Sequence, residues 1–272
     1  MRLLNGSDLS YYIKERQARQ VRSLRQTHGV SPKLLVLRDS NSPIISKYVE
    51  LKKTYGEDIS VGVDDRVVSG DLEVFKSEII RANQDSNLHG IIVQLPLQNP
   101  GQTDEVISLI DANKDVDNLT EGSDFIAATA LAIDWLVTGY NVDLERSRIA
   151  IVGRGRLVGR PLRKLWQARK LDITVFGRND SQDLPSRLPG YNVVITATGV
   201  PGLIKSDMIA SKTVVVDAGT AEDDSSIVGD FSDDLYDRDD LTITPRVGGV
   251  GPLTIAALFD NAIRAAEKTI KK

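Results

Sequence analysis

Residues 149–161, IAIVGRGRLVGRP, decide how this chain folds. An apolar run meets the turn Gly153-Arg154-Gly155, and Gly159 follows four residues later. A helical pattern then covers 162–170, and a second apolar strand begins at Ile173. This order predicts a phosphate-binding turn, because glycine lets the backbone approach a diphosphate and a helix N-terminus presents free N–H groups. The spacing departs from G-x-G-x-x-G by one residue, so a glycine turn without a ligand is the alternative.

The composition excludes several classes of protein. A chain of 272 residues, 41% of them hydrophobic, can bury the core of one or two domains. Its net charge of −4 argues against binding to nucleic acid. Cysteine is absent and neither His28 nor His89 belongs to a ligand cluster, so we expect no metal site. Without a signal peptide or a long apolar run, we expect a cytoplasmic protein that does not contact membranes.

Helices and strands alternate along the first half of the chain, which predicts a parallel sheet with helices on both faces. The expected strands are 33–37, 59–63 and 89–95. The expected helices run from Ser7 or Asp8, as the cap, to Gln26, and over 44–55, 72–84, 103–112 and 126–138.

The alternation restarts between Gly139 and Leu144, so we expect a second α/β domain. Its strands are predicted at 149–152, 173–176, 193–196, 213–217 and 241–244, and a last helix at 254–272. The stretch Glu222–Asp240 carries nine acidic residues and one arginine, which predicts a solvated loop.

Three segments of the first half carry side chains suited to chemistry. Tyr48 and Lys52 lie four residues apart on one helix face, where a ring and an amine can act together. Gln94 ends a buried strand at the edge where open α/β sheets bind ligands. Asp117 follows in the loop KDVD at 114–117. Taken singly, each also fits a solvated helix face, a structural amide or an exposed loop.

Together these segments resemble the bifunctional methylenetetrahydrofolate dehydrogenase/methenyltetrahydrofolate cyclohydrolase family. The matching motifs, in order, are YVELK at 48–52, GIIVQLPL at 90–97, KDVD at 114–117, VGRGRLVGRP at 152–161, VGD at 228–230 and TPRVGGVGPLT at 244–254. The resemblance covers nearly the whole chain. It implies NADP-dependent oxidation of 5,10-methylenetetrahydrofolate and hydrolysis of the product to 10-formyltetrahydrofolate, which supplies purine biosynthesis.

The resemblance also implies an organisation and a set of roles. A catalytic domain at 1–139, completed by a helix at 253–272, would accompany a Rossmann domain at 140–252, with folate in the cleft between them. Lys52 would be the catalytic lysine, Gln94 its partner, Tyr48 the ring that stacks on folate, and Asp117 the carboxylate that binds the pterin. Further residues, Gly249, Val250, Gly251 and Pro252, would line the cleft. The partners would be tetrahydrofolate derivatives and a second copy of the chain.

Three departures from the family pattern limit what can be carried over. Asn118 stands where the family has glycine after KDVD, and asparagine tolerates a left-handed backbone. The family's P-C-T-P is Ala127-Ala128-Thr129-Ala130 here, which puts the second activity in doubt. Gly155 replaces a serine of the glycine turn.

The predicted cofactor is NADP. No carboxylate follows the strand 172–176 before Asp180, whereas Arg154 and Arg178 can both reach a 2′-phosphate. We expect Gly153, Gly155, Gly159, Thr198 and Gly199 to bind the rest of the dinucleotide. The alternative is that both arginines face solvent and Asp180 binds the ribose. Two other functions stay open: a different Rossmann-fold dehydrogenase, and a relative that keeps one activity or none.

Overall fold

The computed structural model describes residues 1–68, 70–223 and 226–270, which form two compact units. Unit 1 consists of Met1–Ser10 and Thr129–Thr254, and unit 2 of Tyr11–Ala128 and Ile255–Lys272. Each unit is built on a parallel sheet with helices around it, which confirms the predicted α/β class. Every helix of the described ranges is too short or too polar to cross a membrane.

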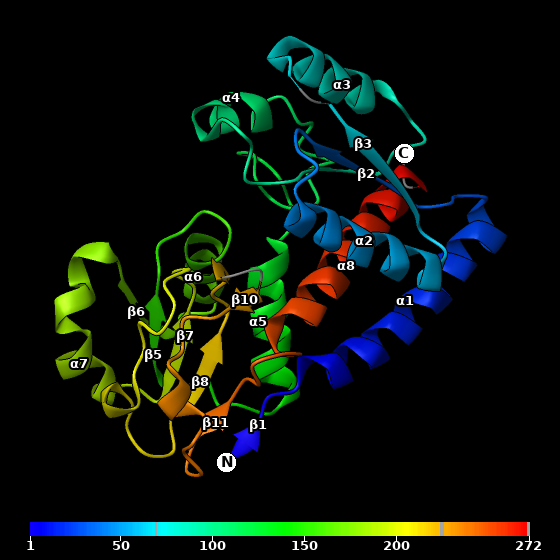
Figure 1. Cartoon of the computed structure of the whole chain (residues 1–272). Helices are drawn as coiled ribbons and strands as arrows, with labels where there is room; N and C mark the ends of the chain where they lie inside the picture. The colour runs from blue at the N-terminus through cyan, green and yellow to red at the C-terminus, as the bar shows by residue number, and fades with distance from the viewer. Residues whose placement is uncertain (69, 224–225, 271–272) are drawn as a thin grey trace. The chain divides into compact units, whose positions relative to one another are not determined.

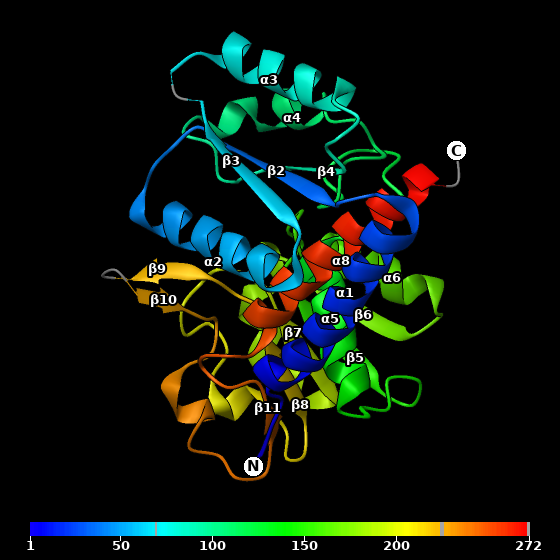
Figure 2. The same ribbon diagram turned by 90° about the vertical axis from the view of Figure 1, so that its right-hand side faces the viewer.

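Unit 2 contains a three-stranded parallel sheet in the order β3-β2-β4. The strands are β2 (Lys33–Arg38), β3 (Gly62–Val67) and β4 (Gly90–Val93). The apolar residues of β2 are buried on both faces, as a central parallel strand requires. Figure 2 shows α2 (Pro43–Ile59) on one side of this sheet and α3 (Leu72–Gln84) on the other. These helices cover the two faces of the sheet, so the side chains at its carboxyl edge are available to form a binding site.

The other helices of unit 2 are the greater part of α1 (Gly6–His28), the short α4 (Thr103–Ile107) after a 3₁₀ turn at Pro100–Gln102, and α8 (Val250–Ile270) from Ile255 onward. Several sequence predictions were wrong in detail. The strand expected at 59–63 starts at Gly62, because α2 continues to a buried Ile59 and ends on left-handed Ser60. Asn5, rather than Ser7 or Asp8, caps α1, because its Oδ1 accepts from Ser7 N at 3.0 Å. The helix expected at 103–112 ends at Ile107.

Unit 1 contains a six-stranded parallel sheet in the order β1-β11-β8-β7-β5-β6. Its strands are β1 (Arg2–Leu3), β5 (Arg148–Val152), β6 (Asp172–Phe176), β7 (Val193–Thr196), β8 (Val214–Asp217) and β11 (Thr242–Ile243). The central strands β5 and β7 are almost wholly buried, so helices must cover both faces.

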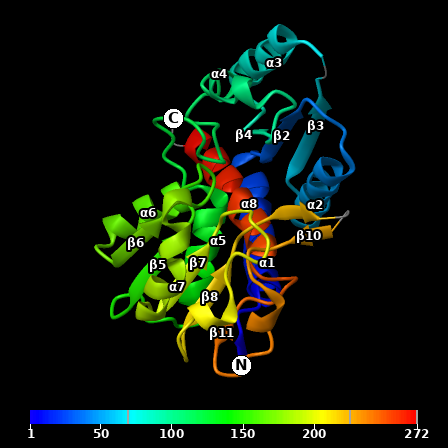
Figure 3. The same cartoon turned by 60° about the vertical axis from the view of Figure 1, so that its left-hand side comes forward.

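The helices of unit 1 divide between the two faces of the sheet. On one face, α5 (Ala128–Gly139) meets α6 (Gly159–Ala168), where Trp166 Nε1 donates to Asp134 Oδ1 at 2.7 Å. The chain crosses from β5 to β6 and back to β7, so right-handed connections place α7 (Leu184–Arg187) on the other face. Figures 1 and 3 show these helices beside the strands.

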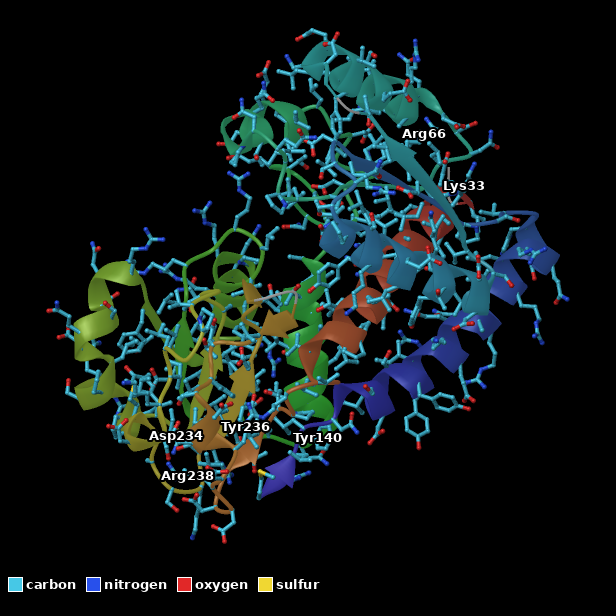
Figure 4. The ribbon with its side chains drawn as sticks, viewed as in Figure 1. Lys33, Arg66, Tyr140, Asp234, Tyr236 and Arg238 are labelled. Atoms are coloured by element: carbon cyan, nitrogen blue, oxygen red, sulfur yellow. The ribbon has the colours of Figure 1, made fainter. Side chains whose placement is uncertain are left out.

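The acidic stretch 222–240 is folded in its described part, so the prediction of a solvated loop was wrong. It forms strand β10 (Ser226–Val228), paired with β9 (Ala221–Asp223), and a 3₁₀ turn at Asp233–Leu235. Phe231 and Leu235 join the core of the unit, and Tyr236 packs against it. Arg238, labelled in Figure 4, pairs with Asp240 and donates to two carbonyl oxygens of the segment 206–209. The high proportion of acidic residues in the sequence did not reveal these apolar and hydrogen-bonded contacts.

Candidate active site

Helix α2 presents Tyr48 and Lys52 on one partly buried face. Ser42 Oγ accepts from Ile45 N at 3.2 Å and Pro43 occupies the first turn, so the sequence fixes where the helix starts. Burial raises the pKa of the Tyr48 hydroxyl, which therefore stays protonated at neutral pH. The pair is four residues apart, as the sequence predicted, and supplies a ring and an amine side by side.

Lys52 meets Gln94, which directly follows β4 at the carboxyl edge of the sheet. Lys52 Nζ donates to Gln94 Oε1 at 2.9 Å, and Gln94 Nε2 donates to the carbonyl oxygen of Leu95 at 3.1 Å. The second bond fixes which end of the amide faces the lysine. Burial lowers the pKa of Lys52, with Asp117 acting in the opposite direction. A lysine with a depressed pKa can exchange protons more readily than an exposed one.

Asp117 completes this group of side chains. Asp115, two residues earlier, bridges to Ile91 of β4 in parallel, so the KDVD loop leaves the sheet at the same edge as Gln94. Burial raises the pKa of Asp117 to about 6; Lys52 lowers it and Asp115 raises it further. The structure thus brings Lys52, Gln94 and Asp117 together, and two of them have pKa values moved toward neutrality.

The turn after Asp117 survives without the family's glycine. Asn118 adopts φ 57°, a left-handed backbone that asparagine tolerates. Its Nδ2 also donates to the carbonyl oxygens of Ser123 and Phe125, which glycine could not do. In place of P-C-T-P, buried alanines at 127, 128 and 130 lead directly into α5.

In unit 1, the glycine turn after β5 has the close backbone contacts of a phosphate cradle. Gly153 adopts φ 120°, and a Cβ there would lie 2.4 Å from the carbonyl oxygen of Ala197. A Cβ on Gly159 would lie 2.0 Å from the carbonyl oxygen of Gly153. Gly155 would point a Cβ into open space, so the fold also accepts the family's serine there. The turn therefore fits a dinucleotide diphosphate at the start of α6.

The arginines expected at the 2′-phosphate are arranged differently from each other. Arg154 Nη2 donates to Asp180 Oδ2 and to the carbonyl oxygen of Val175, both at 3.1 Å. Asp180 Oδ2 also accepts from Gly177 N at 2.6 Å. Arg178 is exposed. The structure thus holds Arg154 at the end of β6 through Asp180, a contact that the sequence analysis did not anticipate.

Two aspartates, the buried Asp230 and the partly buried Asp217, support the turns after β7 and β8, and sequence reasoning gave neither a role. Asp230 Oδ2 accepts from Thr198 N at 2.7 Å and from the Thr196 hydroxyl, and Oδ1 accepts from Val200 N at 3.0 Å. This carboxylate sets the backbone of Thr198 and Gly199, two of the predicted cofactor residues.

Asp217 has a similar place at the end of β8. It accepts from Gly219 N at 2.8 Å and Phe231 N at 3.0 Å, and burial raises its pKa to about 6. A Cβ on Gly219 would lie 2.1 Å from Asp230, and one on Gly229 2.2 Å from Asp217. The signal was present in the sequence, since each aspartate lies within two residues of a glycine.

Gly249, Val250, Gly251 and Pro252 belong to unit 1, at the start of α8. A Cβ on Gly6 would lie 1.8 Å from the carbonyl oxygen of Gly249, so α1 and this segment touch through their backbones. A Cβ on Gly251 would meet open space. The part of this segment in a substrate site stays a prediction.

One unit carries a glycine turn that fits a dinucleotide, and the other brings Lys52, Gln94 and Asp117 together. These two features define an enzyme with a dinucleotide-binding domain. Comparison with known protein families identifies the family to which the chain belongs. Residues 4–117 match the catalytic domain of tetrahydrofolate dehydrogenase/cyclohydrolase, and residues 127–270 its NAD(P)-binding domain. The chain therefore belongs to the tetrahydrofolate dehydrogenase/cyclohydrolase family, which confirms the resemblance found in the sequence.

Individual relatives match over their full length. The bifunctional protein FolD of Sulfurovum sp. is 32% identical over 98% of this chain and 99% of its own. The FolD crystal structure from Campylobacter jejuni superimposes with a TM-score of 0.92 at 29% identity, covering 99% of each chain. The Trypanosoma brucei enzyme, solved with NADP and an inhibitor, has a TM-score of 0.93 at 25% identity, over 99% of this chain and 98% of its own.

Proposed function

We propose that this chain oxidises 5,10-methylenetetrahydrofolate to the 5,10-methenyl compound with NADP and hydrolyses that product to 10-formyltetrahydrofolate. The observation that carries the proposal is the contact of Lys52 Nζ with Gln94 Oε1 at 2.9 Å, coupled to Asp117, in a member of this family. When bound, NADP accepts the hydride of the one-carbon bridge. The side chains then have to orient the folate and handle protons.

Lys52 is the proton-handling group of the hydrolytic step. Because burial lowers its pKa, Lys52 loses its proton to become a neutral amine at a lower pH than an exposed lysine does. The amine takes a proton from water as the water oxygen bonds to the methenyl carbon. The ammonium then returns a proton to the ring nitrogen as the bond between that nitrogen and the carbon breaks, and the hydroxyl of the adduct releases its remaining proton to solvent, which leaves the 10-formyl group. Gln94 holds Nζ in place, and such acid–base catalysis contributes roughly 10²–10⁴-fold to the rate.

Tyr48 and Asp117 hold the folate in this proposal. The ring of Tyr48 stacks on the flat ligand, and the Asp117 carboxylate accepts hydrogen bonds from pterin N–H groups. Asp117 suits that role because it is partly buried and its pKa, about 6, leaves it ionised at neutral pH. We also assign the backbone at 249–252, in unit 1, to substrate binding.

The cofactor residues are Gly153, Arg154, Gly155, Gly159, Arg178, Thr198 and Gly199. Arg154 pairs with a 2′-phosphate as a planar two-pronged donor, and Arg178 approaches from solvent. The contacts of Asp180 support the preference for NADP over NAD. Its Oδ2 is engaged by Gly177 N and Arg154, whereas a residue that selects NAD presents its carboxylate to the ribose.

A member with only the dehydrogenase activity is the second candidate. The observation that favours it is the replacement of P-C-T-P by Ala127–Ala130 at the start of α5, which removes two backbone constraints beside the KDVD loop. In either case we propose a cytoplasmic homodimer that associates through its Rossmann domains and supplies purine biosynthesis.

The proposal is tested by following both steps in one spectrophotometer. Purified protein with methylenetetrahydrofolate and NADP should produce NADPH, and with methenyltetrahydrofolate it should speed loss of the methenyl absorbance. NADPH formation without faster methenyl loss would establish the second candidate. No turnover with NADP or NAD would refute the proposed function.

A further inference from the structure

The last helix, α8, reaches the loop that carries Asp117 through a fully buried side chain. Asn261 is 0% exposed, and its Nδ2 donates to the carbonyl oxygens of Val116 and Ile126, both at 2.8 Å. Carbonyl oxygens only accept, so the nitrogen end of the amide must face them. Asn261 Oδ1 is then left buried without a partner among the described residues. All hydrogen bonding by this side chain therefore goes to two backbone carbonyls.

Those two carbonyls mark the two ends of the loop 116–126. Asp115, directly before the loop, braces it from within: its Oδ2 accepts from Thr120 N at 2.6 Å and from the Thr120 hydroxyl at 2.7 Å. Asn118 bonds the far side of the loop, as described above. Among the described residues, no hydrogen bond of this network passes through the Asp117 carboxylate. The position of Asp117 is therefore set by its backbone, which Asn261 holds at the adjacent residue.

The same helix also contacts the helix of the catalytic lysine. Phe259, two residues before Asn261, stacks on Tyr55 of α2 with ring centroids 5.0 Å apart. The Tyr55 hydroxyl donates to Gln17 Oε1 and Gln17 Nε2 donates to the carbonyl oxygen of Ala256, both at 2.8 Å. Tyr55 lies one helical turn beyond Lys52. Figures 1 and 2 show α8 running alongside α1 in this unit.

We propose that Asn261 is a positioning residue that holds Asp117 in register with Lys52, so that the C-terminal helix sets the geometry of the folate-binding carboxylate. This inference rests on the proposed function, since it assigns a role to Asp117 in binding folate. A buried amide with a merely structural role would stabilise the unit without regard to Asp117. The two roles differ in one respect: a positioning residue loses its effect on the ligand once Asp117 is removed.

A double-mutant cycle with tetrahydrofolate as the probe separates them. The proteins are the unaltered chain, Asn261→Ala, Asp117→Ala and the double variant, and calorimetric titration gives each Kd for tetrahydrofolate and for NADP. We expect Asn261→Ala to raise the tetrahydrofolate Kd about tenfold in the unaltered chain and less than twofold beside Asp117→Ala. The Kd for NADP should stay within twofold throughout.

Asn83→Ala is the matched control, because Asn83 also makes two hydrogen bonds to backbone, at Leu109 and Asp111, in the same unit. It should lower stability and leave the tetrahydrofolate Kd unchanged. If Asn261→Ala does not fold, Asn261→Ser, whose hydroxyl keeps one donor, takes its place with a smaller effect. Equal losses of affinity with and without Asp117 would overturn the inference alone. Failure of the unaltered chain to bind tetrahydrofolate would overturn the proposed function as well.

Discussion

Replacing Asp117 by asparagine should stabilise the protein above neutral pH while it damages the site. The carboxyl titrates at about 6, against 3.8 for an unperturbed aspartate, mainly because it is buried. Each pH unit is worth about 1.4 kcal/mol, so ionised Asp117 lowers the free energy of unfolding by about 3 kcal/mol. The folded state binds the proton more tightly than the unfolded state. Stability therefore falls as pH rises from about 4 to about 6, and the loss is complete above that range.

Urea denaturation of both proteins between pH 4 and pH 8, followed by circular dichroism, measures this effect. The advantage of Asp117→Asn should be near zero at pH 4 and approach about 3 kcal/mol above pH 7. The protein's two tryptophans, Trp135 and Trp166, both lie in unit 1, so their fluorescence follows the other unit as a reference. Glu121→Gln, exposed in the same loop, is the control and should give no gain. An advantage that is the same at pH 5 and pH 8, or a loss at pH 8, would refute the reasoning.

The remaining predictions concern activity and assembly. Lys52→Met should remove cyclohydrolase activity and keep NADP binding. A folded variant with near-normal methenyl hydrolysis would show that Lys52 is not the proton-handling group. Asp117→Ala should raise the Kd for tetrahydrofolate about tenfold, because an unpaired buried donor of the pterin costs ~1–3 kcal/mol. A change in the Kd for NADP instead would show that Asp117 does not bind the folate. Arg154→Ala with Arg178→Ala should abolish the preference for NADP in kcat/KM, and retention of that preference would contradict the assignment. Light scattering should give twice the 29.8 kDa chain mass at micromolar concentration, and the mass of one chain would contradict the dimer.

Much of the fold could be predicted because its signals are local. The helix at 72–84 and the strand at 193–196 have the predicted bounds, since helical periodicity marks the first and a run of β-branched residues the second. Asn118 adopts the left-handed backbone for which asparagine is suited. The strand expected at 59–63 was misplaced because a single isoleucine fits either a helix end or a strand start. Strand β1 has two residues and exists only through its pairing with β11, which no local pattern reveals.

The candidate site could be predicted only in part, for the same reason. Tyr48 and Lys52 are neighbours by helix geometry, but the contact of Lys52 with Gln94 joins residues 42 positions apart. Asn261 lies 145 residues from Val116, so nothing near it in the sequence indicates its role. The carboxylates Asp217 and Asp230 were overlooked because acidic residues are usually exposed, and only the fold shows how many backbone N–H groups they accept from.

Transfer of deuterium tests the central claim most directly, because it follows the hydride itself. Methylenetetrahydrofolate in which both hydrogens of the one-carbon bridge are deuterium would be incubated with NADP and the purified chain. The recovered dinucleotide would be analysed by mass spectrometry. The account predicts NADPH that carries one deuterium on the nicotinamide, with the other retained on the one-carbon group of the folate product. Reduced dinucleotide without deuterium, or none above the level of an enzyme-free control, would contradict the account.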